Sequence, residues 1–337
     1  MISDKDVEYY RQNGYLVVPD VLDADLLTRL RRALDALVAN ASSVSSHTDV
    51  YDLEPGHTPA APKVRRIKLP HTHTPVFWEL ANYRPMVAIM EQLLGPSGVR
   101  LQSSKINLKA PHYGSPVEWH QDWAFYPHTN DDMLAVGVML DDSFLENGPL
   151  LVVPGSHKGP TWDHHSGGYF CGAMDPTRKE VDFESAVPLT GRAGSMSFHH
   201  VRMVHGSAQN VSDKPRRLLL YEFSAGDAFP LMGIKDWEQY NRNLVSGTPI
   251  NVPRIVPAPV RMPLPPRRSK ARSTKTRPRR RTNISNGGNP PRSESRRTRR
   301  RAGAIFWGES DRRQCPFAGP PSPCPALCRH WLGAGMV

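Results

Sequence analysis

The sequence predicts a mainly β fold of the jelly-roll class with flanking helices. Three observations predict it: short β-rich runs follow one another over residues 98–230, turn residues separate these runs, and helical patterns are confined to residues 1–97. Many short strands with such punctuation are typical of sandwiches and barrels. We expect one domain over residues 1–266, with a helical part at 1–97 and a jelly-roll core at 98–230.

Two helices and a strand are predicted at the start of the chain. Ser3 followed by Asp6 resembles a capping box that opens a short helix. Residues 15–19 have the composition of a strand. A second helix begins after Asp23 or Asp25, because the apolar residues that follow recur with a helical period: Leu26, Leu27, Leu30, Ala33, Leu34 and Leu37.

The next segments complete the predicted element order. Residues 41–64 are polar and proline-rich, which predicts a loop. A helical pattern returns over residues 75–94, with Thr74 as its expected cap, and ends at Gly95-Pro96. The β-rich runs of the core then cover residues 99–108, 117–123, 133–140, 150–154, 195–198 and 217–223.

The positive charge of the chain is confined to its last part. The net charge is +11, yet residues 267–337 hold 18 Lys and Arg against three acidic residues, so the remainder is mildly acidic. Such a segment has too few apolar residues to offset its chain entropy by burial. We therefore expect a disordered basic tail. The sharp change after Pro266 favours translation in a shifted reading frame over a functional arm.

Cysteine usage and hydropathy favour the cytoplasm. Only Cys171 lies in the first 266 residues, so no disulfide framework is predicted there. No apolar run approaches the roughly 20 residues of a membrane span. The first residues also lack the basic and apolar regions of a signal peptide. We expect a cytoplasmic protein without a membrane partner, and the sequence leaves its oligomeric state open.

A histidine and a carboxylate stand two positions apart in His120-Gln121-Asp122. Alternate residues of a strand share a face, so both side chains can reach one ion. With the distant His205 they form the set of two histidines and one carboxylate that suits non-haem Fe(II). A surface strand with a polar face is the alternative for the triplet. Its place between two tryptophans favours burial, and a buried carboxylate requires a counter-charge such as a cation.

At these residues the chain resembles the phytanoyl-CoA dioxygenase (PhyH) family of iron- and 2-oxoglutarate-dependent oxygenases. The resemblance runs from the N-terminal helices to about residue 266, and its most specific stretches are residues 119–122, 147–158 and 205–216. It implies a double-stranded β-helix core, which is a cupin-like jelly roll. It also implies that His120, Asp122 and His205 are the Fe(II) ligands.

The resemblance further implies a site for 2-oxoglutarate. Arg216 matches the residue that pairs with the distal carboxylate of this co-substrate, and a guanidinium is shaped for bidentate binding of a carboxylate. Arg217 is the alternative, but strand alternation lets only one of the two point inward. The other expected co-substrate contacts are Ser207, Gln102 and Lys68. A turn serine is the alternative for Ser207, and a solvated face is the alternative for Lys68.

Candidate substrate contacts are less specific. Trp123, Phe125 and Tyr126 follow the triplet directly, and they form either an apolar wall of the site or part of the core. Lys105 and Asn107 lie on the preceding predicted strand and could face the cavity. Adjacent histidines, such as His199-His200, are not expected to bind one ion together, because neighbouring residues of a strand face opposite ways.

The implied function is that of a dioxygenase using Fe(II), 2-oxoglutarate and O₂. It hydroxylates, or otherwise oxidises, an unactivated C–H bond of a small organic substrate and produces succinate and CO₂. One alternative is a jelly-roll metal enzyme that does not use 2-oxoglutarate, against which Arg216 argues. Another is a nucleic-acid-binding protein that acts through its basic tail. No specific nucleic-acid partner is expected, because aromatic residues are not interleaved with the charges of the tail.

Overall fold

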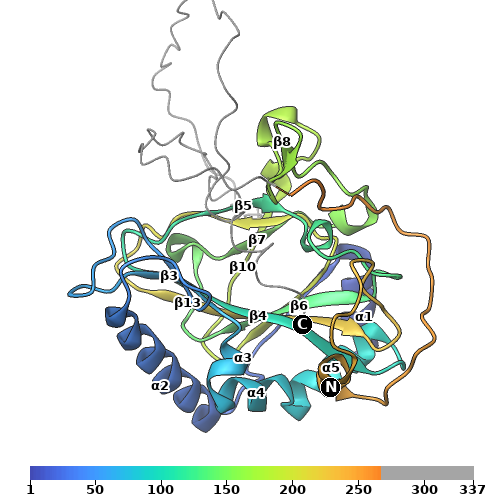
Figure 1. Cartoon of the computed structure of the whole chain (residues 1–337), viewed down its shortest axis with the longest axis horizontal. Helices are drawn as coiled ribbons and strands as arrows, with labels where there is room; N and C mark the ends of the chain where they lie inside the picture. The colour runs from blue at the N-terminus through green and yellow to red at the C-terminus, as the bar shows by residue number, and fades with distance from the viewer. Residues whose placement is uncertain (267–337) are drawn as a thin grey trace, which may run out of the picture.

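Two antiparallel sheets face each other in the computed structural model, which describes residues 1–266 (Figure 1). The larger sheet has the order β1 (Tyr15–Val18), β11 (Met196–His200), β6 (Met133–Met139), β13 (Arg216–Ala225), β4 (Val99–Lys109), β3 (Val64–Lys68) and β2 (Tyr51–Leu53), with β14 (Leu244–Ser246) paired to β4. The smaller sheet has the order β10 (Val187–Leu189), β7 (Leu150–Val152), β12 (His205–Ser207) and β5 (Val117–His120). The predicted jelly roll is confirmed. The predicted disorder of residues 267–337 lies outside the described residues.

Helices cover the outer face of the larger sheet (Figure 1). They are α1 (Asp4–Asn13), α2 (Ala24–Asn40), α3 (Pro70–His73), α4 (Pro75–Ala81) and α5 (Arg84–Leu94), while α6 (Trp237–Arg242) precedes β14. The capping box of Ser3 and Asp6 is present, and the side chain of Asp23 caps α2. The single helix predicted over 75–94 is wrong, because the chain breaks between α4 and α5, where Pro85 occupies the first turn of the new helix.

The predicted loop at residues 41–64 is also partly wrong. It contains β2, which pairs with β3 at the edge of the larger sheet. Tyr51 of β2 is buried, and its hydroxyl donates to the carbonyl of Leu37 at 2.8 Å. The strand is three residues long and depends on these tertiary contacts, so local periodicity could not reveal it.

The main hydrophobic core lies between the helices and the larger sheet. Leu30 and Leu34 of α2 belong to it, and β13 contributes Leu219, Tyr221 and Phe223. The intervening residues of β13 face the other way, toward the space between the two sheets, because strand residues alternate. Part of that space is filled by a second apolar cluster that includes Leu218 and Leu220 of β13. Its remaining part is polar and holds the site described below.

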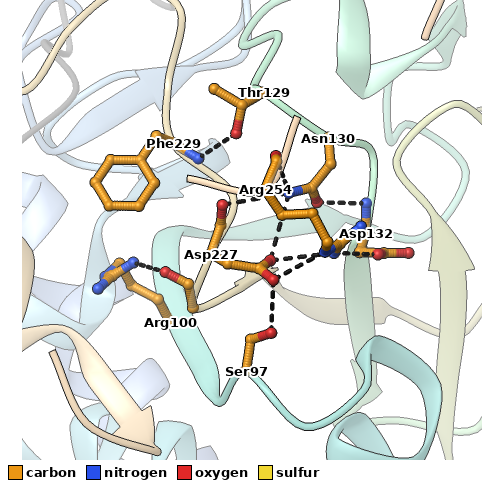
Figure 2. A network of polar contacts seen from close by, with 9 residues as sticks. Ser97, Arg100, Thr129, Asn130, Asp132, Asp227, Phe229 and Arg254 are labelled. Atoms are coloured by element: carbon orange, nitrogen blue, oxygen red, sulfur yellow. Dashed lines mark hydrogen bonds and ion pairs between the residues drawn. The ribbon is translucent and has the colours of Figure 1, made fainter. Parts of the chain in front are cut away.

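A long extended segment closes the described chain and runs back along the surface toward β8 (His165–Ser166) and β9 (Tyr169–Phe170) (Figure 1, orange). Figure 2 shows how it is attached near its start: Arg254 binds the carboxylate of Asp227 through Nε at 2.8 Å and through Nη2 at 3.1 Å. Arg254 also pairs with Asp132. Farther along, the carbonyl of Pro265 accepts a hydrogen bond from the backbone N–H of Phe170 at 2.9 Å.

Replacing Arg254 with alanine is expected to lower the free energy of unfolding by about 1–2 kcal/mol, because two carboxylates lose a charged hydrogen-bond partner. The partial exposure of Arg254, whose side chain is 39% accessible, keeps the effect at this level. Urea denaturation measures it. Arg242→Ala is the control, since the side chain of Arg242 is 59% exposed and contacts Glu238 and Gln239 of its own helix, and we expect a change near zero. Equal effects of the two substitutions would contradict the anchoring role of Arg254.

Candidate metal centre

Three ligand-bearing side chains converge between the sheets. His120 is the last residue of β5 and His205 the first of β12, and the two residues pair directly across these antiparallel strands. Their ring centroids are 4.1 Å apart. The side chain of Asp122 joins them, and one ligand atom from each of the three residues lies within 4.8 Å of the other two. All three residues are buried, so the cluster is shielded from bulk water.

Asp122 reaches the cluster by a turn and not by strand alternation. The strand ends at His120, and Asp122 opens a short 3₁₀ helix (Asp122–Ala124). The prediction that both residues share one strand face is therefore wrong, although their side chains do meet. The side-chain amide of Gln121 holds the turn by donating to the carbonyls of Pro160 and Arg202 at 3.1 and 2.8 Å.

The histidine rings are oriented by the backbone. Nδ1 of His120 lies 2.8 Å from the carbonyl of Glu118, and Nδ1 of His205 lies 3.0 Å from the carbonyl of Met203. A carbonyl can only accept, so both Nδ1 atoms carry the proton and both Nε2 atoms present a lone pair. These Nε2 atoms lie 3.6 and 3.7 Å from the Asp122 carboxylate. This tautomer and orientation suit metal ligation through Nε2.

The protonation states also suit a cation. Burial opposes the ionisation of Asp122, but the ammonium of Lys105 helps to hold the pKa of this carboxyl well below its usual range. Burial, assisted by the neighbouring His120, lowers the pKa of His205 well below its usual range. The cluster therefore offers one carboxylate and neutral imidazole at His205, the forms in which these groups bind a metal.

Unpaired donors lie in the same cavity as the metal cluster. Arg216 opens β13 and is 2% exposed, and its Nε and Nη1 atoms make no hydrogen bond within the described chain. The hydroxyl of Ser207 is likewise buried without a partner. Burial lowers the pKa of Arg216 to about 10, so the guanidinium remains charged near neutral pH. A buried cation with unsatisfied donors fits an anionic ligand such as a carboxylate.

Two of the expected co-substrate residues lie elsewhere. Gln102 falls where the pairing of β4 with β13 shifts register, and its amide donates to Ser224 at 2.7 Å. Lys68 donates to the carbonyl of Thr48 at 2.5 Å and pairs with Asp52 at 3.5 Å. Neither is among the residues that line the cavity. The bulge changes which residues of β4 face inward. Lys68 is held outside the cavity by its contacts with Thr48 and Asp52, which belong to the segment that the sequence predicts to be a loop.

The predicted substrate-side residues divide between wall and core. Phe125 lines the cavity, with its ring 5.9 Å from the ring of His120. Trp123 and Tyr126 pack in a buried cluster with Met133 and Val201, and the phenol of Tyr126 also interacts with the Asp122 carboxylate. Lys105 and Asn107 both line the cavity, as their strand position predicts.

His199 is a polar residue of the site that sequence reasoning missed. It lies on β11 with its Nε2 atom 3.7 Å from the Asp122 carboxylate, and its ring centroid is 4.6 Å from that of His205. The residue is fully buried, and neither ring nitrogen makes a hydrogen bond within residues 1–266. His200 points the opposite way, toward His157. Adjacent histidines do face opposite ways, and one of them thereby reaches the cavity.

Two histidines and one carboxylate on a jelly roll, beside a buried arginine with free donors, define a non-haem iron oxygenase site. The phytanoyl-CoA dioxygenase (PhyH) family model matches residues 10–218. The chain is 36% identical to a probable alpha-ketoglutarate-dependent hypophosphite dioxygenase of Stutzerimonas stutzeri, over 79% of this chain and 93% of the relative. It is 28% identical to an ectoine dioxygenase of Sphingopyxis alaskensis, over 64% and 73%. The crystal structure of EctD from S. alaskensis with bound Fe superposes with a TM-score of 0.57 at 26% identity, over 67% of this chain and 77% of that chain.

The chain belongs to the PhyH family. It is accordingly an Fe(II)- and 2-oxoglutarate-dependent dioxygenase that uses O₂ and acts on a small molecule. The comparisons favour neither of the two alternatives, a jelly-roll enzyme without 2-oxoglutarate or a nucleic-acid-binding protein. Within residues 1–266, none of the helices has the length and apolar character needed to cross a membrane.

Proposed function

We propose that His120, Asp122 and His205 hold the catalytic Fe(II). The support for this proposal is the convergence of their three ligand atoms in a buried place, with both rings turned by backbone carbonyls so that Nε2 is free. When bound, iron together with 2-oxoglutarate and O₂ transfers one oxygen atom to the substrate and the other to succinate, with release of CO₂. The three side chains fix the ion and leave the rest of its coordination sphere to small molecules.

The proposed contacts of 2-oxoglutarate are Arg216 and Ser207. Both carry buried donors without partners in residues 1–266, and both line the cavity that contains the metal cluster. The guanidinium binds the distal carboxylate, and the hydroxyl donates to the same group. Their role is to orient the co-substrate and to neutralise its charge in a place that water does not reach.

We take the substrate to be a small anion of the hypophosphite type. The support is the 36% identity to a relative with that printed activity, which extends over nearly the whole of the relative. Ectoine is an organic molecule that carries both a carboxylate and a cationic group, and the identity to the ectoine dioxygenase is lower and covers less of this chain. The bond oxidised would then be P–H in place of the C–H bond that the sequence predicts. A cytoplasmic location stays a proposal.

The proposed catalytic domain comprises residues 1–266, since the extended segment up to Pro266 is bonded to the jelly roll. We expect the full chain and a version ending at residue 266 to form succinate at equal rates, with Fe(II), 2-oxoglutarate, O₂ and hypophosphite supplied. A coupled succinate assay measures both rates. Loss of activity in the short version alone would overturn the domain limit. Absence of succinate from both versions would contradict the proposed substrate.

A further inference from the structure

A second buried guanidinium lines the cavity of the metal cluster. Arg66 lies on β3 and is 5% exposed. Its strand pairs with β4 so that Arg66 stands opposite Asn107, and Asn107 stands opposite Leu218 of β13. Arg66 is thus two strands away from β13, on which Arg216 lies. The cavity therefore carries a cationic side chain beyond the one that the co-substrate requires.

Neighbouring side chains hold Arg66 in place while leaving most of its donors free. Its Nε donates to Oδ1 of Asn107 at 2.9 Å, and its Nη1 lies 3.7 Å from the carboxylate of Asp52. A guanidinium has five N–H donors, and within residues 1–266 Arg66 makes only this one hydrogen bond. Because Asn107 accepts through its oxygen, its amide nitrogen remains a further donor beside Arg66.

Arg66 shares its nearest carboxylate with a second buried cation, Lys68. Arg66 and Lys68 lie 3.7 and 3.5 Å from the same carboxylate, that of Asp52, and all three residues are buried. Lys105 lies 2.7 Å from Glu222 and 3.9 Å from Asp122, and the charge of Asp122 is assigned to the proposed metal ion. A buried charge without compensation is costly, so this part of the cavity favours a ligand that brings one negative charge.

The remaining lining carboxylate does not supply that charge. Glu118 also lines the cavity, but within residues 1–266 it makes no ion pair with Arg66. Arg216 in turn is matched to the distal carboxylate of 2-oxoglutarate by its position and its free donors.

We propose that Arg66, with Asn107 and Lys105 beside it, is the substrate-binding site, and that the substrate is a small oxyanion with a single negative charge. This inference rests on the proposed function. The planar guanidinium offers two parallel N–H groups to the oxygens of such an anion, and the Asn107 amide offers a third donor. Arg66 is then a specificity residue, since a neutral side chain there would leave the anion unpaired.

The test is an anaerobic titration of the full chain, loaded with Fe(II) and 2-oxoglutarate, in which hypophosphite or ectoine is added. The readout is the change of the visible charge-transfer band, which reports binding without turnover. We expect hypophosphite to bind, and Arg66→Gln to raise its Kd at least about tenfold, because charge-assisted hydrogen bonds are lost. Arg66→Lys keeps the charge, and we expect its Kd for hypophosphite to lie between those of the wild type and Arg66→Gln. The Kd of 2-oxoglutarate should change less than about threefold.

A matched control removes one positive charge far from the cavity. Arg192 is 81% exposed, and Arg192→Gln should leave the Kd of hypophosphite unchanged. Perturbation of the band by ectoine and not by hypophosphite would overturn the inference, as would an Arg66→Gln variant that loses 2-oxoglutarate and retains hypophosphite. In both cases the band itself forms, so the proposed function stands. A wild-type protein that forms no band would overturn the proposed function together with the inference.

Discussion

Asp122→Ala is expected to reduce the affinity for Fe(II) more than about 100-fold and to abolish the visible band formed with 2-oxoglutarate. Loss of an outer-shell partner alone typically costs 10- to 100-fold in metal affinity, and Asp122 is the single carboxylate of the proposed ligand set. The substitution also removes the negative charge that favours a divalent cation between two imidazoles. Bound iron per chain after anaerobic loading and gel filtration measures the first effect, and absorbance measures the second.

The control for this substitution is Asp25→Ala, since the Asp25 side chain is 81% exposed on α2 and does not line the cavity. It should bind one iron per chain and form the full band. Asp122→Asn keeps the shape of the side chain and should recover part of the iron binding at most. An Asp122→Ala variant with an unchanged band would refute the ligand assignment.

Arg216→Ala is expected to raise the Kd of 2-oxoglutarate by about 30-fold or more, while iron binding is retained. Truncating one partner of a buried charge pair typically costs at least about 2 kcal/mol, which corresponds to roughly that factor. The reason is that the distal carboxylate would lie in a buried cavity without its cation. Titration of the iron-loaded variant with 2-oxoglutarate, followed by the visible band, gives the Kd.

The neighbouring residue provides a matched control for Arg216. Arg217 points away from the cavity and binds Asp141 through two nitrogens at 2.8 and 2.7 Å, and its Nη1 also lies 2.8 Å from Asp35. Arg217→Ala should lower stability and leave the Kd of 2-oxoglutarate unchanged. If Arg217→Ala weakened the co-substrate and Arg216→Ala did not, the choice between the two arginines would be reversed.

The elements with strong local signals could be predicted from the sequence. The capping box at Ser3, the apolar stripe of α2 and the β-rich runs are each determined by residues that are neighbours in the sequence. Alternation along a strand also predicted that Lys105 and Asn107 face the cavity. The separation of α4 from α5 was equally readable at Pro85, since proline cannot occupy a helix interior without loss of a hydrogen bond.

The rest depended on tertiary contacts that no local pattern carries. Lys68 and Arg66 lie two positions apart on the same strand, and only the packing of β2 beside them decides that Lys68 turns to Asp52 and Thr48 while Arg66 lines the cavity. The shift in register between β4 and β13 at Gln102 cannot be seen in one strand alone. The inward orientation of His199 could not be predicted, because it depends on which face of β11 covers the site.

The most direct test of the account is the anaerobic titration of the wild-type chain with Fe(II) and then with 2-oxoglutarate. We expect one iron bound per chain, no visible band with iron alone, and a band that saturates at one equivalent of 2-oxoglutarate. Iron that binds without producing a band on addition of 2-oxoglutarate, or a chain that binds no iron although His120, Asp122 and His205 are intact, would contradict it.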